Sequence, residues 1–222
     1  MLTTPGPNTP DMPDEDLPGG AMTLGAILLA GGRATRVGGA DKALFEVGGR
    51  TLIERAVTAV TDAGATGIVA VGPARDADLP GVRWVREDPP FTGPAAAIVA
   101  ALDAAAASEW TLVLACDLAR PDAAAARLVA DLPLLPADAD GVCLADSTSR
   151  PQWLTGAYRT AALRRAAAAL PDAARQASVR ALLDDLAIAV VRVPDPVVAD
   201  VDTWEDLEQA RAAHRRSEGE ET

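Results

Sequence analysis

The chain has 222 residues, 49% of them hydrophobic, a length and composition typical of one globular domain with a sizeable core. Its formal net charge of −12 disfavours DNA or RNA as a partner, because the average field of the protein would repel a polyanion. No run approaches the roughly 20 apolar residues that a membrane span needs, and no signal peptide is evident at the N-terminus. We therefore expect a cytoplasmic protein that binds neither nucleic acid nor a membrane.

The two ends of the chain differ in composition from the rest. Residues 1–23 combine prolines with acidic side chains and offer almost nothing to bury, which predicts a disordered tail. Residues 215–222 are polar and charged, which predicts a second solvated tail. The domain is therefore expected to span residues 24–214.

Between the tails, short apolar runs typical of strands alternate with alanine-rich stretches of helical period. The predicted strands are 26–29, 67–71, 82–85, 110–115, 141–145, 152–158 and 188–193. The predicted helices are 51–64, 93–107, 122–132, 160–170, 178–186 and 202–214. This alternation indicates an α/β fold, a single Rossmann-like three-layer domain in which a largely parallel sheet carries helices on both faces.

Cys116 and Cys143 lie in two of the apolar runs and form no CxxC pair. We expect two buried, reduced thiols rather than a disulfide or a metal site, which agrees with a cytosolic location.

A glycine-rich, cationic loop follows the first predicted strand. Gly31 and Gly32 let backbone N–H groups approach an anion closely, and Arg36 and Lys42 add positive charge in an acidic protein. Ligands of such sheets bind at the carboxyl ends of the strands, so the loop is a candidate phosphate-binding site. Its spacing fits neither a P-loop nor a GxGxxG fingerprint. Lys42 is the only lysine among 20 basic residues, and the alternative is a surface lysine without a role.

The run LAGGRATRVGGADKAL resembles the signature LAGG-x3-R-x-GG-x-DK-x-L of the molybdenum cofactor guanylyltransferases, a branch of the nucleotide-diphosphate-sugar transferase superfamily. Further stretches resemble the family's later landmarks in the same order: VRED ending at Asp88, GPAAAI from Gly93, LACDLARP around Asp117, RPQWLTGAY, and ADVDTWEDL from Ala199. The resemblance covers about Thr23 to Arg211.

This resemblance implies transfer of GMP from GTP to molybdopterin with release of pyrophosphate, and a requirement for Mg²⁺. The nucleotide-binding residues that it implies are Leu29, Ala30, Gly31, Gly32, Lys42, Asp88 and Asp117. Catalysis would rest on Lys42, Arg36 and Asp117, and the metal ligands would be Asp117 and Asp202. It also implies encounters with other proteins of the molybdenum cofactor pathway. A reaction between two anions agrees with this set, because it needs positioning and charge neutralisation above all.

Several of these residues have plainer interpretations. Asp117 follows a predicted strand and could cap the next helix, although Asp122 after Pro121 is the better cap. Asp202 could be the N-cap of the last helix rather than a metal ligand. Arg36 could form a surface salt bridge. His214, the only histidine, is expected to be solvated or to interact with the dipole at the end of the last helix.

The chain also departs from the family pattern. The family has an asparagine associated with guanine recognition where this chain has Gly72 or Pro73. A CTP-dependent molybdopterin cytidylyltransferase, or a transferase that uses another phosphorylated acceptor such as phospholactate, therefore stays an alternative. So does a non-catalytic, nucleotide-binding regulatory protein. The segment around Ser178 to Leu186 could line an acceptor site with Arg175 or Arg180, or be an amphipathic packing helix.

Overall fold

The computed structural model describes residues 22–32, 38–73 and 79–220. The strands of the main sheet are β1 (Leu24–Leu29), β4 (Ala65–Val71), β5 (Val82–Val85), β6 (Trp110–Ala115), β7 (Gly141–Ala145), β8 (Pro151–Arg159) and β9 (Ile188–Arg192). A separate hairpin consists of β2 (Glu46–Val47) and β3 (Arg50–Thr51). The helices are α1 (Leu52–Asp62), α2 (Pro94–Ala104), α3 (Pro121–Asp131), α4 (Thr160–Ala169), α5 (Val179–Leu183), α6 (Asp195–Val198) and α7 (Trp204–Glu220). Short 3-10 turns are η2 (Lys42–Leu44), η3 (Leu132–Leu134) and η4 (Pro171–Ala174).

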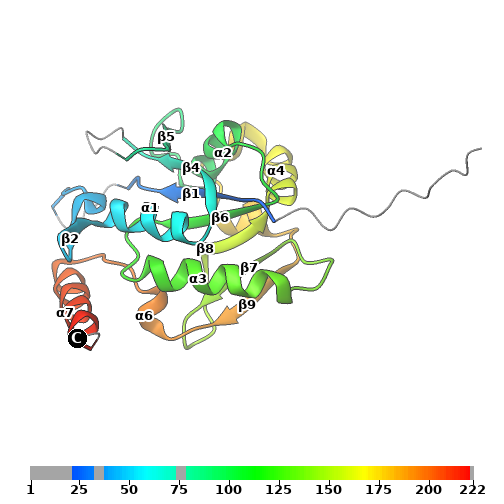
Figure 1. Ribbon diagram of the computed structural model, residues 1–222. Coiled ribbons are helices and arrows are strands. Elements are labelled where there is room, and N and C mark those ends of the chain that lie inside the picture. Colours follow the sequence, from blue (N-terminus) through cyan, green and yellow to red (C-terminus); the bar gives the residue numbers. More distant parts are fainter. Residues whose placement is uncertain (1–21, 33–37, 74–78, 221–222) are drawn as a thin grey trace, which may run out of the picture.

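The seven strands of the main sheet lie in the order β5-β4-β1-β6-β8-β7-β9 (Figure 1). β5, β4, β1 and β6 are mutually parallel, and β7 is parallel to β9. β8 runs antiparallel to both of its neighbours. The predicted largely parallel sheet is therefore confirmed, with one antiparallel strand inserted between β6 and β7.

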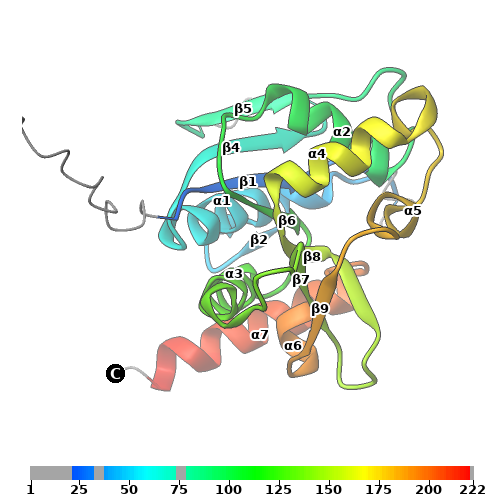
Figure 2. The same cartoon turned by 90° about the vertical axis from the view of Figure 1, so that its right-hand side faces the viewer.

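Helices cover both faces of the sheet, as Figures 1 and 2 show. On one face, α1 and α3 pack against one set of strand residues, which includes Leu28 and Leu112. On the other face, α2, α4 and α5 pack against the alternate set, which includes Ile27 and Val113. Successive residues of β1 and β6 thus enter opposite cores, so both strands are almost entirely apolar. The exception is Thr111 of β6, whose buried hydroxyl is hydrogen-bonded to that of Thr160 at 2.7 Å. This is the predicted three-layer architecture.

Both cysteines lie in the core as buried thiols, as expected. Burial raises the pKa of Cys143 to about 12, because the thiolate would lose its hydration there. None of the helices in the described part of the chain has the length and apolarity that crossing a membrane requires.

The last helix continues beyond the boundary expected at residue 214. α7 extends to Glu220, into the segment predicted to be a solvated tail. The segment is polar but contains good helix formers, and Arg211 stabilises the helix surface through an ion pair with Glu208 at 2.7 Å. His214 therefore does not lie at a helix end. Its ring packs against Gly48, where a Cβ atom would come within 1.9 Å of Nε2.

Gly72, directly after β4, lies against the backbone at the end of β1. A Cβ atom at this position would meet the carbonyl carbon and oxygen of Ala30 at 2.9 Å and the nitrogen of Gly31 at 3.2 Å. The amide of Ala30 also donates to the carbonyl of Val71 at 2.8 Å. Residue 72 therefore has to be glycine for the start of the glycine-rich loop to keep its place.

We expect Gly72→Ala to lower the free energy of unfolding by about 1–3 kcal/mol, because the added methyl group overpacks two backbones that have little freedom to move apart. Gly67→Ala is the matched control, since its Cβ atom would make only an ordinary 3.5 Å contact with Ala106. Urea denaturation of both variants checks the prediction. Equal stabilities of the two variants would contradict it.

Candidate functional site

Lys42 stands at the centre of the candidate site. It begins the short turn η2, and Asp41 caps this turn by accepting a hydrogen bond from the amide of Ala43 at 3.2 Å. The ammonium group of Lys42 forms ion pairs with Asp117, at 3.3 Å, and with Asp202. The structure thus brings together three of the residues that the sequence singles out.

Backbone pairing places the two carboxylates side by side. Asp117 lies just beyond the end of β6, and the amide of Val201 donates to its carbonyl at 2.7 Å. The amide of Ala119 donates to the carbonyl of Ala199 at 2.9 Å, and an antiparallel bridge joins the residues between them. We call these paired segments, 117–119 and 199–201, the aspartate ladder. It carries Asp117 at one corner and leads directly to Asp202.

Neither carboxylate is needed to cap a helix. Thr203 and Asp206 cap α7 reciprocally: the Asp206 carboxylate accepts from the amide of Thr203 at 2.8 Å, and the Thr203 hydroxyl accepts from the amide of Asp206 at 3.2 Å. At α3 the N-cap position is Arg120, without a side-chain cap, and Asp122 lies inside the first turn. The capping interpretation of Asp202 is therefore wrong. Asp117 does not cap α3 either, and the carboxylates of both residues pair with Lys42.

The site is part-buried, so its charged side chains attract one another more strongly than they would in water. The side chains of Lys42, Asp117 and Asp202 are 17%, 28% and 39% exposed. Burial alone would lower the pKa of Lys42, but the hydrogen bonds and charges of the two aspartates outweigh it and raise the pKa above its usual value. Burial raises the pKa of Asp117, and the charge of Lys42 offsets only part of that effect. Lys42 is thus held firmly in its charged form.

A third carboxylate, Asp200, was not expected in this site. Its residue surface is exposed, yet the surrounding protein desolvates the carboxyl group, and the charges of Asp117 and Asp202 raise its pKa further, to about 7. The sequence did contain a signal for it. In an extended segment, residues two apart lie on the same side, so Asp200 and Asp202 in ADVD belong together.

The first four of the expected nucleotide-binding residues, 29–32, differ in whether their backbone groups are already hydrogen-bonded. The carbonyl of Leu29 accepts from the amide of Cys116 at 3.0 Å, and the amide of Ala30 donates to Val71. Gly31 and Gly32 follow them and are exposed, and among the described residues no backbone hydrogen bond engages either one. These two glycines are therefore the part of the stretch with backbone groups open to a ligand.

Of the other expected site residues, one lies outside the described part of the chain and one is not brought to Lys42. Arg36 lies outside the described residues. Asp88 is exposed beyond β5, and among the described residues no ion pair or hydrogen bond joins its carboxylate to the Lys42 cluster. Its carbonyl accepts a hydrogen bond from Arg175 at 3.1 Å, which ties this segment to the chain after η4.

An aromatic pair supports the cluster from outside. The rings of Phe45 and Trp204 are stacked with centroids 4.8 Å apart. Phe45 is the C-cap of η2, and Trp204 begins α7, two residues after Asp202. The stack thus joins the elements that carry Lys42 and Asp202, a contact between distant positions that no local pattern predicts.

The donor set fits a hard divalent cation such as Mg²⁺. Two carboxylates from different elements converge on one positive charge, and Mg²⁺ is commonly held by one or two carboxylates together with substrate phosphates. Within the described part of the chain, no group of three or more histidine, cysteine, aspartate or glutamate side chains is arranged to hold a metal ion by itself. The protein alone therefore supplies a partial site, which substrate oxygens would complete.

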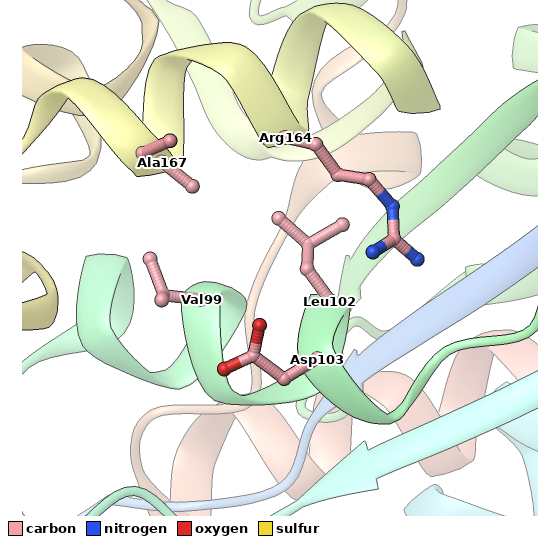
Figure 3. Close-up of a pocket in the computed structure, with 6 residues that line it drawn as sticks. Val99, Leu102, Asp103, Arg164 and Ala167 are labelled. Atoms are coloured by element: carbon pink, nitrogen blue, oxygen red, sulfur yellow. The ribbon is translucent and has the colours of Figure 1, made fainter.

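A cavity of about 260 Å³ between α2 and α4 is not part of this site (Figure 3). It is lined by Val99, Leu102, Asp103, Arg164, Ala167 and Ala168, and includes none of the expected site residues. Arg164 donates to the carbonyl of Ala105 at 3.2 Å, so its guanidinium already serves a structural contact.

The sequence matches the family described as MobA-like NTP transferase domain over residues 26–190. It is 34% identical over 199 residues to the molybdenum cofactor guanylyltransferase of Acidiphilium cryptum (strain JF-5), a match that covers 85% of this chain and 94% of that protein. Other matches are shorter. The match to the probable molybdenum cofactor guanylyltransferase of Opitutus terrae has 38% identity over 107 residues and spans about half of both proteins, 47% of this chain and 52% of the relative.

Solved structures show the same fold. Molybdopterin-guanine dinucleotide biosynthesis protein A from Archaeoglobus fulgidus superposes with a TM-score of 0.60 at 19% identity, covering 86% of this chain and 98% of that one. A Mycobacterium tuberculosis H37Rv protein solved as a complex with manganese superposes with a TM-score of 0.60 at 16% identity, covering 86% and 100%. The family match and the long alignment with the A. cryptum relative confirm the resemblance of the opening motif: the chain belongs to the MobA-like NTP transferase family and is a nucleotidyltransferase.

Proposed function

We propose that the protein transfers GMP from GTP to molybdopterin and releases pyrophosphate, with Mg²⁺ as the metal ion. The observation that carries the proposal is the convergence of Asp117 and Asp202 on the ammonium group of Lys42. The exposed backbone of Gly31 and Gly32 adds to it. The names of the relatives support guanylyl transfer and a molybdenum cofactor substrate. A cytoplasmic location fits the two buried thiols.

Each group has a role in bringing two anions together. The acceptor's phosphate oxygen attacks the α-phosphorus of the nucleotide, and the bond to the pyrophosphate oxygen breaks. The amides of Gly31 and Gly32 would bind phosphate oxygens, and the Lys42 ammonium would turn from the carboxylates to the triphosphate and neutralise its charge. Asp117 and Asp202 would hold Mg²⁺, which supplies further charge neutralisation at the phosphates when bound.

The identity of the base is a separate question, because Gly72 or Pro73 lies where the family has an asparagine associated with guanine. The close approach of Gly72 to Ala30 leaves no room for a side chain at residue 72. Since neither glycine nor proline has a hydrogen-bonding side chain, a base-recognition group must come from another part of the chain, and a cytidylyltransferase is the second candidate on this ground.

Calorimetric titration with GTP, CTP, ATP and UTP, each with Mg²⁺ and with a chelator, tests the proposal. We expect GTP to bind at least about tenfold more tightly than the other three, a difference of about 1.4 kcal/mol. A guanylyl transfer assay with molybdopterin then tests the acceptor. Preference for CTP would favour the cytidylyltransferase, and binding without turnover would favour a regulatory protein.

We expect Lys42→Met to raise the KM for the nucleotide and to lower kcat, with a combined loss of about 10²- to 10³-fold in kcat/KM. The reason is that the variant loses the charge that neutralises the triphosphate in both the ground state and the transition state. Pyrophosphate release measures the effect. Arg83→Gln, an exposed position on the edge strand β5, is the control for loss of one positive charge. Wild-type kinetics of the lysine variant would contradict the assigned role.

A pair of variants separates metal binding from helix capping. We expect Asp202→Asn to leave the free energy of unfolding within about 0.5 kcal/mol of wild type but to raise the Mg²⁺ concentration needed for half-maximal activity. Thr203→Ala should show the opposite pattern, a loss of about 1 kcal/mol with little change in Mg²⁺ dependence, because Thr203 is the cap of α7. Urea denaturation and Mg²⁺ titration of activity give both readouts. An unchanged Mg²⁺ dependence in Asp202→Asn would rule out its role as a ligand.

A further inference from the structure

A second, larger cavity lies outside the Lys42 cluster. It is a groove of about 780 Å³ bounded by α1, the start of α3, the segment 195–200 and α7. Figures 1 and 2 show α6 beside α7 on this side of the molecule. Ala119, Ala199 and Asp200 form part of its lining, whereas Lys42, Asp117 and Asp202 do not. The aspartate ladder therefore separates the groove from the candidate active site.

The groove contains a guanidinium group whose hydrogen bonds are incomplete. Arg55 of α1 donates from Nη2 to the carbonyl of Ala119 at 3.2 Å and from Nη1 to the carbonyl of Val47 at a long 3.5 Å. Its Nε atom is buried and has no hydrogen-bond partner among the described residues. A buried donor without a hydrogen bond costs about 1–3 kcal/mol, so an acceptor for Nε would stabilise the Arg55 side chain.

Arg55 also lacks a partner of opposite charge. Within the described part of the chain no carboxylate lies within ion-pair distance of it, and both of its acceptors are neutral carbonyls. Burial lowers the pKa of Arg55, and the charge of Asp122 opposes this only in part. A part-buried guanidinium without a counter-ion is an attractive partner for an anion.

The other polar and charged groups that line the groove do not neutralise the positive charge of Arg55. Arg50 donates to the neutral hydroxyl of Thr58 at 2.7 Å. Among the groove's carboxylates, Asp122 pairs with Arg120 at 3.2 Å, and Asp206 caps α7. A further one, Asp195, accepts from the amide of Ser147 at 2.8 Å, and Asp62 has an exposed surface at which water screens its charge. The remaining one, Asp200, belongs to the aspartate ladder. None of them forms an ion pair with Arg55.

We propose that this groove binds a small molecule through a phosphate or carboxylate group, with Arg55 as the central donor. A modest rotation of the side chain would exchange the long bond to Val47 and the unpaired Nε for charge-assisted hydrogen bonds to two oxygens of one anion. Arg50 and Arg216, which also line the groove, add positive charge around the same space. The groove is of the size that accommodates a small metabolite.

The experiment follows the Nε–H signal of Arg55 in ¹⁵N–¹H spectra of the full-length protein. Its absence from the spectrum of Arg55→Lys identifies the signal. Inorganic phosphate and succinate are titrated separately, against KCl at equal ionic strength. We expect a saturable shift with phosphate, with succinate or with both, which identifies the preferred oxyanion. No shift, or a shift that KCl reproduces, would overturn the proposal.

Two variants localise the binding. Arg216→Gln, an exposed change on α7, should weaken the affinity for the anion by about three- to tenfold, whereas Arg83→Gln on the edge strand β5, which does not line the groove, should leave it unchanged. The same titration in Lys42→Met should retain its affinity. Loss of the shift in the lysine variant would place the anion at the nucleotide loop and would overturn the proposal. These titrations contain no nucleotide, so their outcome does not depend on whether the protein has the proposed transferase activity.

Discussion

A single ammonium group joins three distant parts of this chain. Lys42 follows the glycine-rich loop, Asp117 follows β6 and Asp202 precedes α7, and the three meet in one part-buried cluster. Burying charges is costly, and attraction repays that cost only when each charge has a close partner. Two carboxylates therefore need a cation between them, and they can change partner from an ammonium group to a metal ion without rebuilding the site. The chemistry that we propose uses this exchange of partners.

The aspartate ladder makes such a site rigid with few residues. Its backbone hydrogen bonds fix the spacing of Asp117 and Asp202 independently of the side chains. On the groove side, Arg55 donates hydrogen bonds to the carbonyl of Ala119 in the ladder and to the carbonyl of Val47 in the β2–β3 hairpin. The aspartate ladder thus lies between the groove and the Lys42 cluster and contributes residues to both.

The sequence predicted the parts of this structure that depend on neighbouring residues. Apolar runs located the strands, glycines beside a unique lysine pointed to a candidate phosphate loop, and the family resemblance singled out Asp117. Contacts between distant segments were not accessible in this way. Asp200 joins the cluster only because the ladder brings it there, and the tight packing of Gly72 is set by Ala30 on another strand. The sequence left Asp202 open as a metal ligand or as the cap of α7, because Asp202 and Thr203 are both residue types that cap helices. The contacts of Thr203 with Asp206 and of Asp202 with Lys42 distinguish the two residues. The sequence did not predict that α7 continues to Glu220, because polarity alone does not distinguish a solvated helix from a disordered tail.

The ladder also has a consequence for the way the protein is made. Its second segment, 199–201, and Asp202 follow all seven strands of the main sheet in the chain, whereas the glycine-rich loop and Asp117 are synthesised much earlier. A growing chain can therefore contain every strand of the sheet while it still lacks one of the two carboxylates that pair with Lys42. The nascent protein has its glycine-rich loop long before the Lys42 cluster can form, because the cluster needs residue 202.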